Sequence, residues 1–348
     1  MNTPTTTPPT IIVRTSGGFF SRLAGAICWL LLFGFVFSIW TGNSEMVSWS
    51  GNVTGLTETH QSGNATATSK VAIVTITGII GDGHGYVKQQ IDQIRRDSQV
   101  KAIVLRVNSP GGTVYGSDFI LHHLKKLREE RDLPLVVSMG GMATSGGYYV
   151  AMAIGDQEDV LFAEPTTTTG SIGVILPHYD FSQLLKRYDV QNDAIVSHPR
   201  KQMLSMTRSL SDEHRSILQA QVDELFSRFK LVVRSGRPAL RNDPEQLERL
   251  ATGEVFTANQ ALDNGLIDKI GFIEDAIERA SQLANLNSNQ FQVIQYQRPG
   301  SLFNLIGMAR TEPASANLQT LLEPLTPRAY FLFTTLPPLV SAYQPLNY

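Results

Sequence analysis

The feature that most constrains this chain is a regular alternation of short apolar runs with amphipathic segments. The runs Val71–Ile80, Lys101–Val107 and Pro134–Gly140 are rich in valine, isoleucine and leucine, which is typical of buried strands. Helix-like segments, Tyr86–Asp97 and Ser117–Glu130, separate them. Parallel strands need such crossovers, and their burial on both faces accounts for the continuous apolar runs. The sequence therefore predicts an α/β fold with a mainly parallel sheet.

The same alternation continues along the chain, and 348 residues with 42% hydrophobic content suffice for a large core. Ser211 has the position of an N-cap before the longest predicted helix. No internal repeat is present, so a single α/β domain is the simplest organisation. The further expected strands are Val160–Ala163, Gly170–Ile175 and Asn192–Val196, and the further expected helices are Phe181–Tyr188, Asp212–Ser235, Glu245–Ala251, Thr257–Asn264 and Phe272–Leu286.

An apolar run near the N-terminus predicts a membrane anchor. Leu23–Trp40 has no charged residue and is close to the ~20 residues that a spanning helix needs. Arg14 and Arg22 precede it, and Glu45 is the first charge after it, so residues 1–22 are expected in the cytoplasm. The alternative is a cleaved signal peptide. No Ala-x-Ala follows the run, however, and the run exceeds the usual length for such peptides.

Composition divides the remainder into parts. Residues 1–22 are rich in Thr and Pro and are predicted to be disordered, and residues 41–69 have the Gly, Ser, Thr and Asn content of a flexible tether. The predicted α/β domain covers residues 70–287. Residues 288–348 are expected to form an extension that could dock on a neighbouring subunit.

Charge and cysteine content exclude two further features. A net charge of -2, without a basic block, gives no reason to expect a nucleic-acid partner. The lone cysteine, Cys28, excludes a disulfide framework.

A serine lies where a predicted strand gives way to a predicted helix, in "MATSGGYYVAMA" (Met142–Ala153). The start of a helix offers backbone amides without partners and a partial positive charge, both useful beside a nucleophile such as Ser145. Gly146 and Gly147 would allow a sharp turn and the close approach of a substrate. The alternative is that Ser145 is only an N-cap, and the G-x-S-x-G pattern of nucleophile elbows is absent.

Two other glycine-containing loops follow predicted strands. "NSPGGTVYGS" (Asn108–Ser117) contains Gly111 and Gly112, whose backbone N–H groups could bind the oxyanion of an acyl-transfer intermediate. The alternative is a simple turn, since Pro-Gly is a common turn dipeptide. "TTTTGSIGV" (Thr166–Val174) places Ser171 beside another strand.

The order of SPGG, TSGGYY, TGSIGV and then a lysine before a long helix resembles the bacterial signal peptide peptidase A family. The similarity covers Val71–Leu286, including "GEVFTANQALDNGLIDKIG" (Gly253–Gly271). The resemblance implies a serine-lysine peptidase with a ClpP/crotonase-like fold of repeated ββα units, preceded by one transmembrane helix. It also implies a homo-oligomer, octameric for a short subunit. No metal or nucleotide cofactor is expected, because the sequence has no HExxH motif, no P-loop and no metal-site spacing of histidines. The expected substrates are signal-peptide remnants and misfolded exported proteins, on the periplasmic side of the inner membrane.

A serine hydroxyl needs a group that accepts its proton. A lysine can do so when burial in an apolar pocket lowers its pKa. Lys201 lies in "SHPRKQML", between a predicted strand and the long helix, and the resemblance also selects it. The alternatives are an ordinary surface lysine, or a Ser-His-Asp triad that uses His178 or His198. Ser197 is followed by His198, where the family commonly has glycine, and "AIGDQEDVLFA" is longer than the usual connection.

These assignments predict a mechanism. Lys201 takes the proton of Ser145, whose oxygen attacks a peptide carbonyl. Backbone N–H groups near Gly112 and Gly146 hold the oxyanion, and the resemblance favours Gly112. The family pattern suggests that Ser171 orients Lys201.

Three other functions remain open at this point. A crotonase-like acyl-CoA enzyme would share the oxyanion amides but would not need the serine or an anchor. An inactive scaffold would keep only the fold. A stomatin-operon peptidase would usually carry further membrane helices, and the apolar run Ala329–Val340 is short and interrupted by proline.

Overall fold

The computed structural model describes residues 55–287, 289–298 and 328–333. The predicted cytoplasmic tail and the predicted anchor Leu23–Trp40 lie outside these residues, as does Cys28. Within the described ranges, no helix is long and apolar enough to cross a membrane. The membrane anchor therefore stays a prediction.

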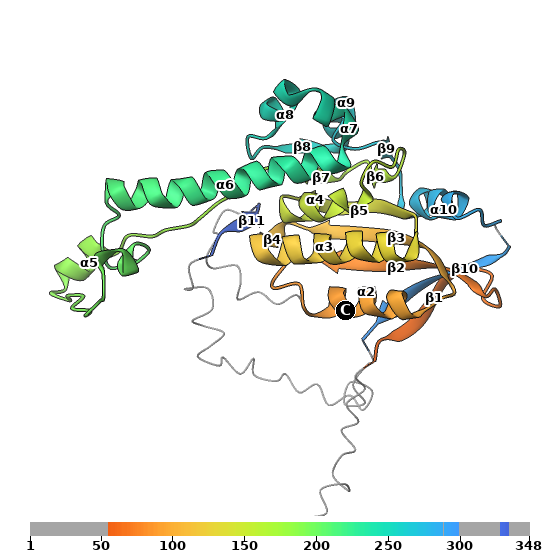
Figure 1. Ribbon diagram of the computed structural model, residues 1–348, viewed down its shortest axis with the longest axis horizontal. Coiled ribbons are helices and arrows are strands. Elements are labelled where there is room, and N and C mark those ends of the chain that lie inside the picture. Colours follow the sequence, from red (N-terminus) through yellow and green to blue (C-terminus); the bar gives the residue numbers. More distant parts are fainter. Residues whose placement is uncertain (1–54, 288, 299–327, 334–348) are drawn as a thin grey trace, which may run out of the picture. The chain divides into compact units, whose positions relative to one another are not determined.

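A nine-stranded sheet of mainly parallel strands forms the centre of the domain (Figure 1), as the sequence predicted. Its order is β1-β10-β2-β3-β5-β6-β9, and the short pair β7 and β8 extends from β5. The neighbours from β10 through β9 run parallel, whereas β1 is antiparallel to β10 and β8 to β7. The strands are β1 (Thr57–Gly63), β2 (Ser69–Thr77), β3 (Val100–Ser109), β5 (Leu135–Thr144), β6 (Leu161–Ala163), β7 (Thr168–Gly170), β8 (Val255–Thr257), β9 (Lys269–Ile270) and β10 (Phe291–Gln297).

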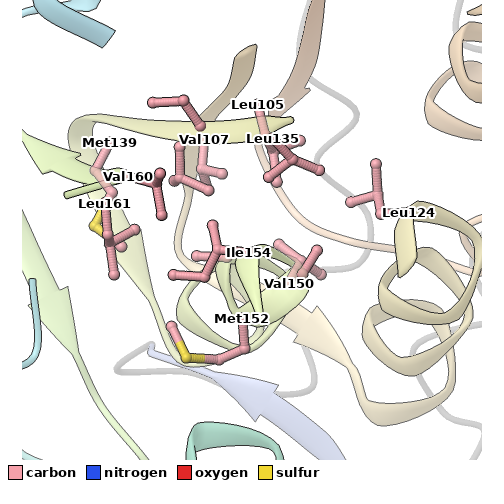
Figure 2. Close-up of a cluster of buried hydrophobic side chains, with 14 of the residues drawn as sticks. Leu105, Val107, Leu124, Leu135, Met139, Val150, Met152, Ile154, Val160 and Leu161 are labelled. Atoms are coloured by element: carbon pink, nitrogen blue, oxygen red, sulfur yellow. The ribbon is translucent and has the colours of Figure 1, made fainter. Parts of the chain in front are cut away.

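Helices pack against this sheet and bury its apolar residues. Figure 2 shows side chains of β3 and β5, such as Leu105 and Met139, packed with Val150 and Ile154 just after the serine corner. All four are fully buried, and each such side chain contributes about 1.5–3 kcal/mol of apolar burial. This packing fixes α4 to the ends of β3 and β5. The helices around the sheet are α2 (Tyr86–Arg96), α3 (Val114–Arg131), α4 (Gly146–Ala151) and α10 (Ile273–Leu283).

The longest described helix, α6 (Asp212–Gly236), follows residues 176–211, none of which is buried. These residues are called the peripheral segment below. Ser211 caps its start, as predicted, because the serine side chain accepts a hydrogen bond from the N–H of His214 at 3.2 Å. Phe229 and Val233, near its end, are buried in the core, whereas most of its first half is exposed. The remaining helices of the described residues are the 3₁₀ turns η2 (Met152–Ile154) and η3 (Pro199–Gln202), and α5 (Ser182–Arg187), α7 (Pro238–Asn242), α8 (Pro244–Leu250) and α9 (Ala258–Asp263).

Two predicted elements are wrong. Asn192–Val196 is not a strand, because no sheet edge lies beside it, and Ile195 within it is fully exposed. The predicted strand Gly170–Ile175 is regular only as far as Gly170, where β7 ends. The tether also ends earlier than its composition indicated, since Thr57–Gly63 forms β1 and pairs with β10.

The predicted C-terminal extension contributes to the fold of its own chain. Strand β10 inserts between β1 and β2, so the sheet continues past residue 287, where the catalytic domain was predicted to end. A second strand, β11 (Tyr330–Leu332), pairs antiparallel with β4 (Gly111–Thr113). The sequence analysis predicted neither strand, and their pairings could not be read from local patterns because the partners lie more than two hundred residues away.

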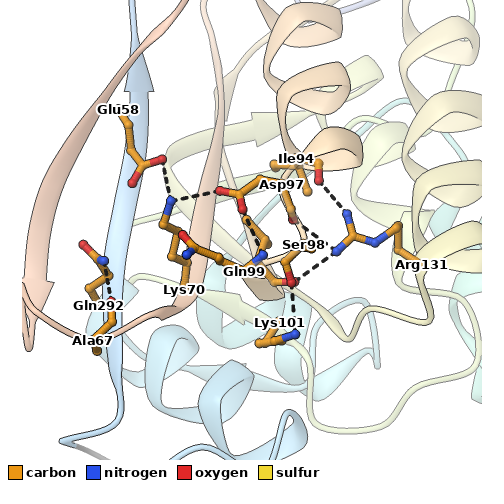
Figure 3. Close-up of polar contacts among 11 residues, drawn as sticks. Glu58, Ala67, Lys70, Ile94, Asp97, Ser98, Gln99, Lys101, Arg131 and Gln292 are labelled. Atoms are coloured by element: carbon orange, nitrogen blue, oxygen red, sulfur yellow. Dashed lines mark hydrogen bonds and ion pairs between the residues drawn. The ribbon is translucent and has the colours of Figure 1, made fainter.

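A partly buried ion pair links β1 to β2. The ammonium group of Lys70 lies 2.9 Å from a carboxylate oxygen of Glu58 and 2.9 Å from one of Asp97 (Figure 3). Burial alone would lower the pKa of Lys70, but hydrogen bonds to the two carboxylates outweigh it and hold this pKa above its ordinary value. Arg131 donates to the carbonyls of Ile94 and the residue after it, which closes the end of α2.

Candidate active site

Ser145 occupies a strained corner between β5 and α4. Its φ of 52° and ψ of -114° are sparsely populated for any residue with a side chain. Two backbone hydrogen bonds hold it there: its N–H donates to the carbonyl of Gly170 at 2.7 Å, and its carbonyl accepts from the N–H of Tyr149 at 2.8 Å. The side chain makes no capping hydrogen bond, so Ser145 does not serve as an ordinary N-cap. The corner therefore leaves the hydroxyl group available for chemistry.

Glycines let three segments meet at this corner. A Cβ on Gly147 would lie 2.8 Å from the carbonyl oxygen of Ser109, and a Cβ on Gly111 would lie 2.7 Å from the backbone nitrogen of Gly146. Any larger residue would collide with backbone atoms at both places. The structure thus brings Ser145 and Gly146 together with β4, which carries Gly112. These are the residues that the sequence assigned to the nucleophile and the oxyanion site.

Ser171 lies in a second left-handed turn next to the serine corner. It directly follows Gly170, the acceptor for the N–H of Ser145, and its own φ is 52°. The N–H of Ser171 donates to the carbonyl of Glu254 at 2.6 Å, and the residue is buried. Its predicted partner, Lys201, is not among its hydrogen-bond partners.

Lys201 lies in a different part of the chain. It belongs to the exposed turn η3, where the neighbouring Arg200 forms an ion pair with Glu213 at the start of α6. The other end of α6 reaches the serine corner, where the rings of Phe229 and Tyr149 lie 5.1 Å apart. The stretch of α6 between Glu213 and Phe229 is about 24 Å long at 1.5 Å per residue. One chain therefore does not place Lys201 beside Ser145.

The two histidines of the alternative triad lie in the same peripheral segment as Lys201. A ring nitrogen of His178 lies 3.3 Å from the carbonyl oxygen of Ser205, and His198 accepts a hydrogen bond from the N–H of Arg200. Across the part of the chain that the structure describes, no lysine, histidine or carboxylate side chain bonds to the Ser145 hydroxyl. The described residues also contain no group of three or more side chains that could hold a metal ion.

Strand β11 lies against β4 and α4 beside the serine corner, and the sequence analysis did not identify it. Phe331 is fully buried and its ring packs against Tyr149 and Phe229. The run around it was interpreted only as too short for a membrane span. Its β-forming composition, bounded by prolines, was the signal that could have identified a strand.

Comparison with known proteins gives several matches. The family model "Peptidase family S49" matches residues 128–287. "Putative signal peptide peptidase SppA" of Enterococcus faecium is 30% identical over 294 residues, covering 78% of this chain and 83% of that protein. "Putative protease slr0021" of Synechocystis sp. is 34% identical over 256 residues, covering 74% and 87%.

Two further matches cover less or are more distant. "Protease 4" of Salmonella typhi is 34% identical over 280 residues, covering 78% of this chain but only 42% of that protein's length. A mutant of ClpP1 from Listeria monocytogenes superposes with a TM-score of 0.39 and 16% identity, covering 59% of this chain and 94% of the other. A TM-score this low does not by itself establish a shared fold.

Proposed function

The chain belongs to the signal peptide peptidase A family, peptidase family S49, and from this premise we propose that it is a serine endopeptidase with Ser145 as nucleophile. One observation carries the proposal: Ser145 is strained at a strand-to-helix corner, yet its side chain caps nothing. Strain of this kind persists only where surrounding structure imposes it, and it gathers at functional sites. The glycines at 111 and 146 add the close backbone approach that an oxyanion site needs.

The proposed mechanism gives each of these groups one role. The hydroxyl oxygen of Ser145 attacks a peptide carbonyl carbon while Lys201 takes the proton. The N–H groups of Gly112 and Gly146 stabilise the negative oxygen of the tetrahedral intermediate. Lys201 then gives the proton to the leaving amine, and water hydrolyses the acyl-enzyme. Ser171, beside the corner, would orient the lysine when it arrives.

The lysine would come from a second copy of the chain. The length of α6 separates Lys201 from Ser145 within one chain, so a homo-oligomer is the arrangement that can join them. The segment around Lys201 also exposes large apolar side chains, which a neighbouring copy would bury. An octamer is the assembly that the family resemblance implies. The exposed large apolar residues of this segment are Phe181, Leu184, Tyr188, Val190, Ile195 and Val196.

The location and the substrates remain proposals that rest on the sequence. An uncleaved anchor at Leu23–Trp40 would hold the catalytic domain on the periplasmic side of the inner membrane, with residues 1–22 in the cytoplasm. Substrates reaching such a site would be signal-peptide remnants and misfolded exported chains. A ClpP/crotonase-like fold of repeated ββα units is the finer description we propose for the α/β domain.

A covalent serine probe tests the proposed activity. The full-length chain in detergent should react with a fluorophosphonate and degrade casein, and Ser145→Ala should do neither. Ser98→Ala, which removes an exposed hydroxyl in the loop between α2 and β3, is the matched control and should behave as wild type. An unlabelled, inactive wild-type assembly would instead support the inactive scaffold.

A further inference from the structure

A buried hydroxyl joins the end of β3 to the neighbouring backbone. Ser109 is the last residue of β3 and is fully buried. Its hydroxyl donates to the carbonyl oxygen of Gly78, just after β2, at 2.6 Å, and accepts from the N–H of Gly111, the first residue of β4, at 3.0 Å. One side chain therefore provides a partner for a backbone acceptor and for a backbone donor that would otherwise lose theirs.

The hydrogen bonds of β4 determine which of its amides is available. The N–H of Thr113 donates to the carbonyl of Ile80 at 2.9 Å, and the N–H of Ile80 donates to the carbonyl of Gly111 at 2.8 Å. With the N–H of Gly111 bonded to Ser109, the first and third amides of β4 both have partners on this edge. Successive amides of a strand point to opposite edges, so the N–H of Gly112, the predicted oxyanion donor, points the other way.

The backbone of Ser109 also packs against the start of α4. A Cβ on Gly147 would lie 2.8 Å from the carbonyl oxygen of Ser109, and a Cβ on Gly111 would lie 2.7 Å from the backbone nitrogen of Gly146. Ser109 thus contacts the residue before one predicted oxyanion donor, Gly112, and the residue after the other, Gly146. A shift of its hydrogen bonds would change the distance between the two donors.

The glycine pair in β4 needs an external restraint. Gly111 has a φ of 101°, a conformation that residues with a side chain rarely adopt. The peptide between Gly111 and Gly112 has no side chain at either end that limits its rotation. Oxyanion donors are effective only when they are already aimed at the developing charge. The bond from Gly111 to Ser109 opposes a rotation that would turn the Gly112 amide away.

We propose that Ser109 is a positioning residue for catalysis. By joining the amide of Gly111 to the carbonyl of Gly78, its hydroxyl fixes the direction of the Gly112 amide towards the oxyanion. Ser109 itself contacts neither the substrate nor the reacting atoms. This inference rests on the proposed peptidase function and adds a residue to which the sequence analysis gave no role.

A purely structural role for Ser109 predicts different kinetics. Loss of stability reduces the number of active sites, but each remaining site keeps its kcat. Loss of an aligned oxyanion donor lowers kcat at every site and leaves KM nearly unchanged, because the oxyanion exists only after attack on the carbonyl. The kinetic constants per labelled site therefore separate the two roles.

Ser109→Ala in the full-length chain tests the proposal. With fluorescent casein as substrate and fluorophosphonate labelling to count active sites, kcat per site should fall by about tenfold to a hundredfold, with KM within about twofold of wild type. The control is Ser138→Ala, which removes a fully buried hydroxyl of β5 bonded to Arg106 at 2.8 Å. It should lower the thermal unfolding temperature and keep the wild-type kcat. A wild-type kcat in Ser109→Ala, or an equal loss in Ser138→Ala, would overturn the proposal.

Ser109→Cys guards against a folding defect in the alanine variant. A thiol keeps nearly the shape of the hydroxyl but is a weak donor and a weak acceptor. The kcat per site should lie between those of wild type and Ser109→Ala. A cysteine variant with the wild-type kcat would contradict a role that depends on hydrogen bonding.

Hydrogen–deuterium exchange provides a readout that does not depend on catalysis. In a Ser145→Ala background, Ser109→Ala should accelerate the exchange of Gly111–Thr113 by about tenfold, because the Gly111 amide loses its acceptor. Ser138→Ala should leave this exchange unchanged. Equal exchange in both variants would show that Ser109 does not hold β4.

The two proposals fail in different ways. A wild-type chain that labels and degrades casein, with an equally active Ser109→Ala variant, overturns the positioning role alone. A wild-type chain that never labels overturns the peptidase function, and the exchange experiment still reports whether Ser109 holds the Gly112 amide in place.

Discussion

The serine corner and the lysine segment contrast in how firmly the fold holds them. Ser145 is 1% exposed, its backbone is hydrogen-bonded to β7 and α4, and its neighbours pack into the main core. Lys201 is exposed in the short turn η3, where its N–H donates to the carbonyl of His198 and the neighbouring Arg200 pairs with Glu213 at the start of α6. In the proposed mechanism, the chain builds the nucleophile and its oxyanion donors by itself. The proposed base, Lys201, would come from a second copy.

The largest expected effect comes from removing the ability of Lys201 to lose its proton. Lys201→Arg keeps the charge, but a guanidinium cannot serve as a base at neutral pH, so kcat should fall at least about a thousandfold. Casein and peptide hydrolysis by the full-length chain would measure it. His178→Ala and His198→Ala should stay active. An active Lys201→Arg protein together with an inactive His198→Ala protein would replace the dyad by a histidine-based site.

A smaller loss is expected from crowding the oxyanion site. The Cβ of Gly146→Ala would lie 2.5 Å from the hydroxyl oxygen of Ser117 and 3.0 Å from the carbonyl of Phe331. The added methyl group would crowd the proposed oxyanion site next to Ser145, so kcat should fall by about a hundredfold to a thousandfold, with KM changed less. Gly85→Ala is the control, because nothing lies within 4 Å of its Cβ. Wild-type kcat in Gly146→Ala would remove this residue from the site.

Disturbing the exposed apolar surface should affect assembly more than folding. Ile195→Asp places a charge on a fully exposed side chain, so the thermal unfolding temperature of the single chain should be almost unchanged. If a second copy covers this surface, the charge should shift the assembly towards monomers and reduce activity about tenfold. Light scattering coupled to size-exclusion chromatography would measure the mass. An unchanged mass would show that this residue lies outside the interface.

The smallest effect concerns the ion pair of Lys70, which belongs neither to the serine corner nor to the lysine segment. Lys70→Met leaves Glu58 and Asp97 without their shared cation and should destabilise the domain by about 1–3 kcal/mol. Because the pKa of Lys70 is raised in the folded state, its stabilisation is complete below pH 10.5 and decreases as the pH rises through the folded-state pKa. Urea unfolding at pH 8 and pH 11.5 would test this. A wild-type pH dependence in Lys70→Met would contradict it.

Local patterns predicted the parts of the molecule that depend on local physics. The β-branched runs identified the central strands, and Ser211 was recognised as a cap because its acceptor role involves only the next turn of helix. The serine and the two glycine loops were found because sharp turns require particular residues. The strain at Ser145 itself was not visible in the sequence.

Pairings across long sequence separations were not predictable from local patterns. Strand β11 joins Gly111–Thr113 from more than two hundred residues away, and nothing in either stretch specifies the other. Asn192–Val196 has the composition of a strand but finds no sheet edge, so its apolar side chains remain exposed. The separation of Lys201 from Ser145 likewise follows from the length of α6 and not from any motif.

Mixing two inactive variants tests the central claim, that Ser145 of one copy works with Lys201 of another. Ser145→Ala and Lys201→Ala chains with different tags would be coexpressed, and assemblies carrying both tags purified. If neighbouring copies share sites, about a quarter of the wild-type activity should return, because half of the copies keep each residue. Mixed assemblies no more active than either variant alone would contradict the account and require a base within the same chain.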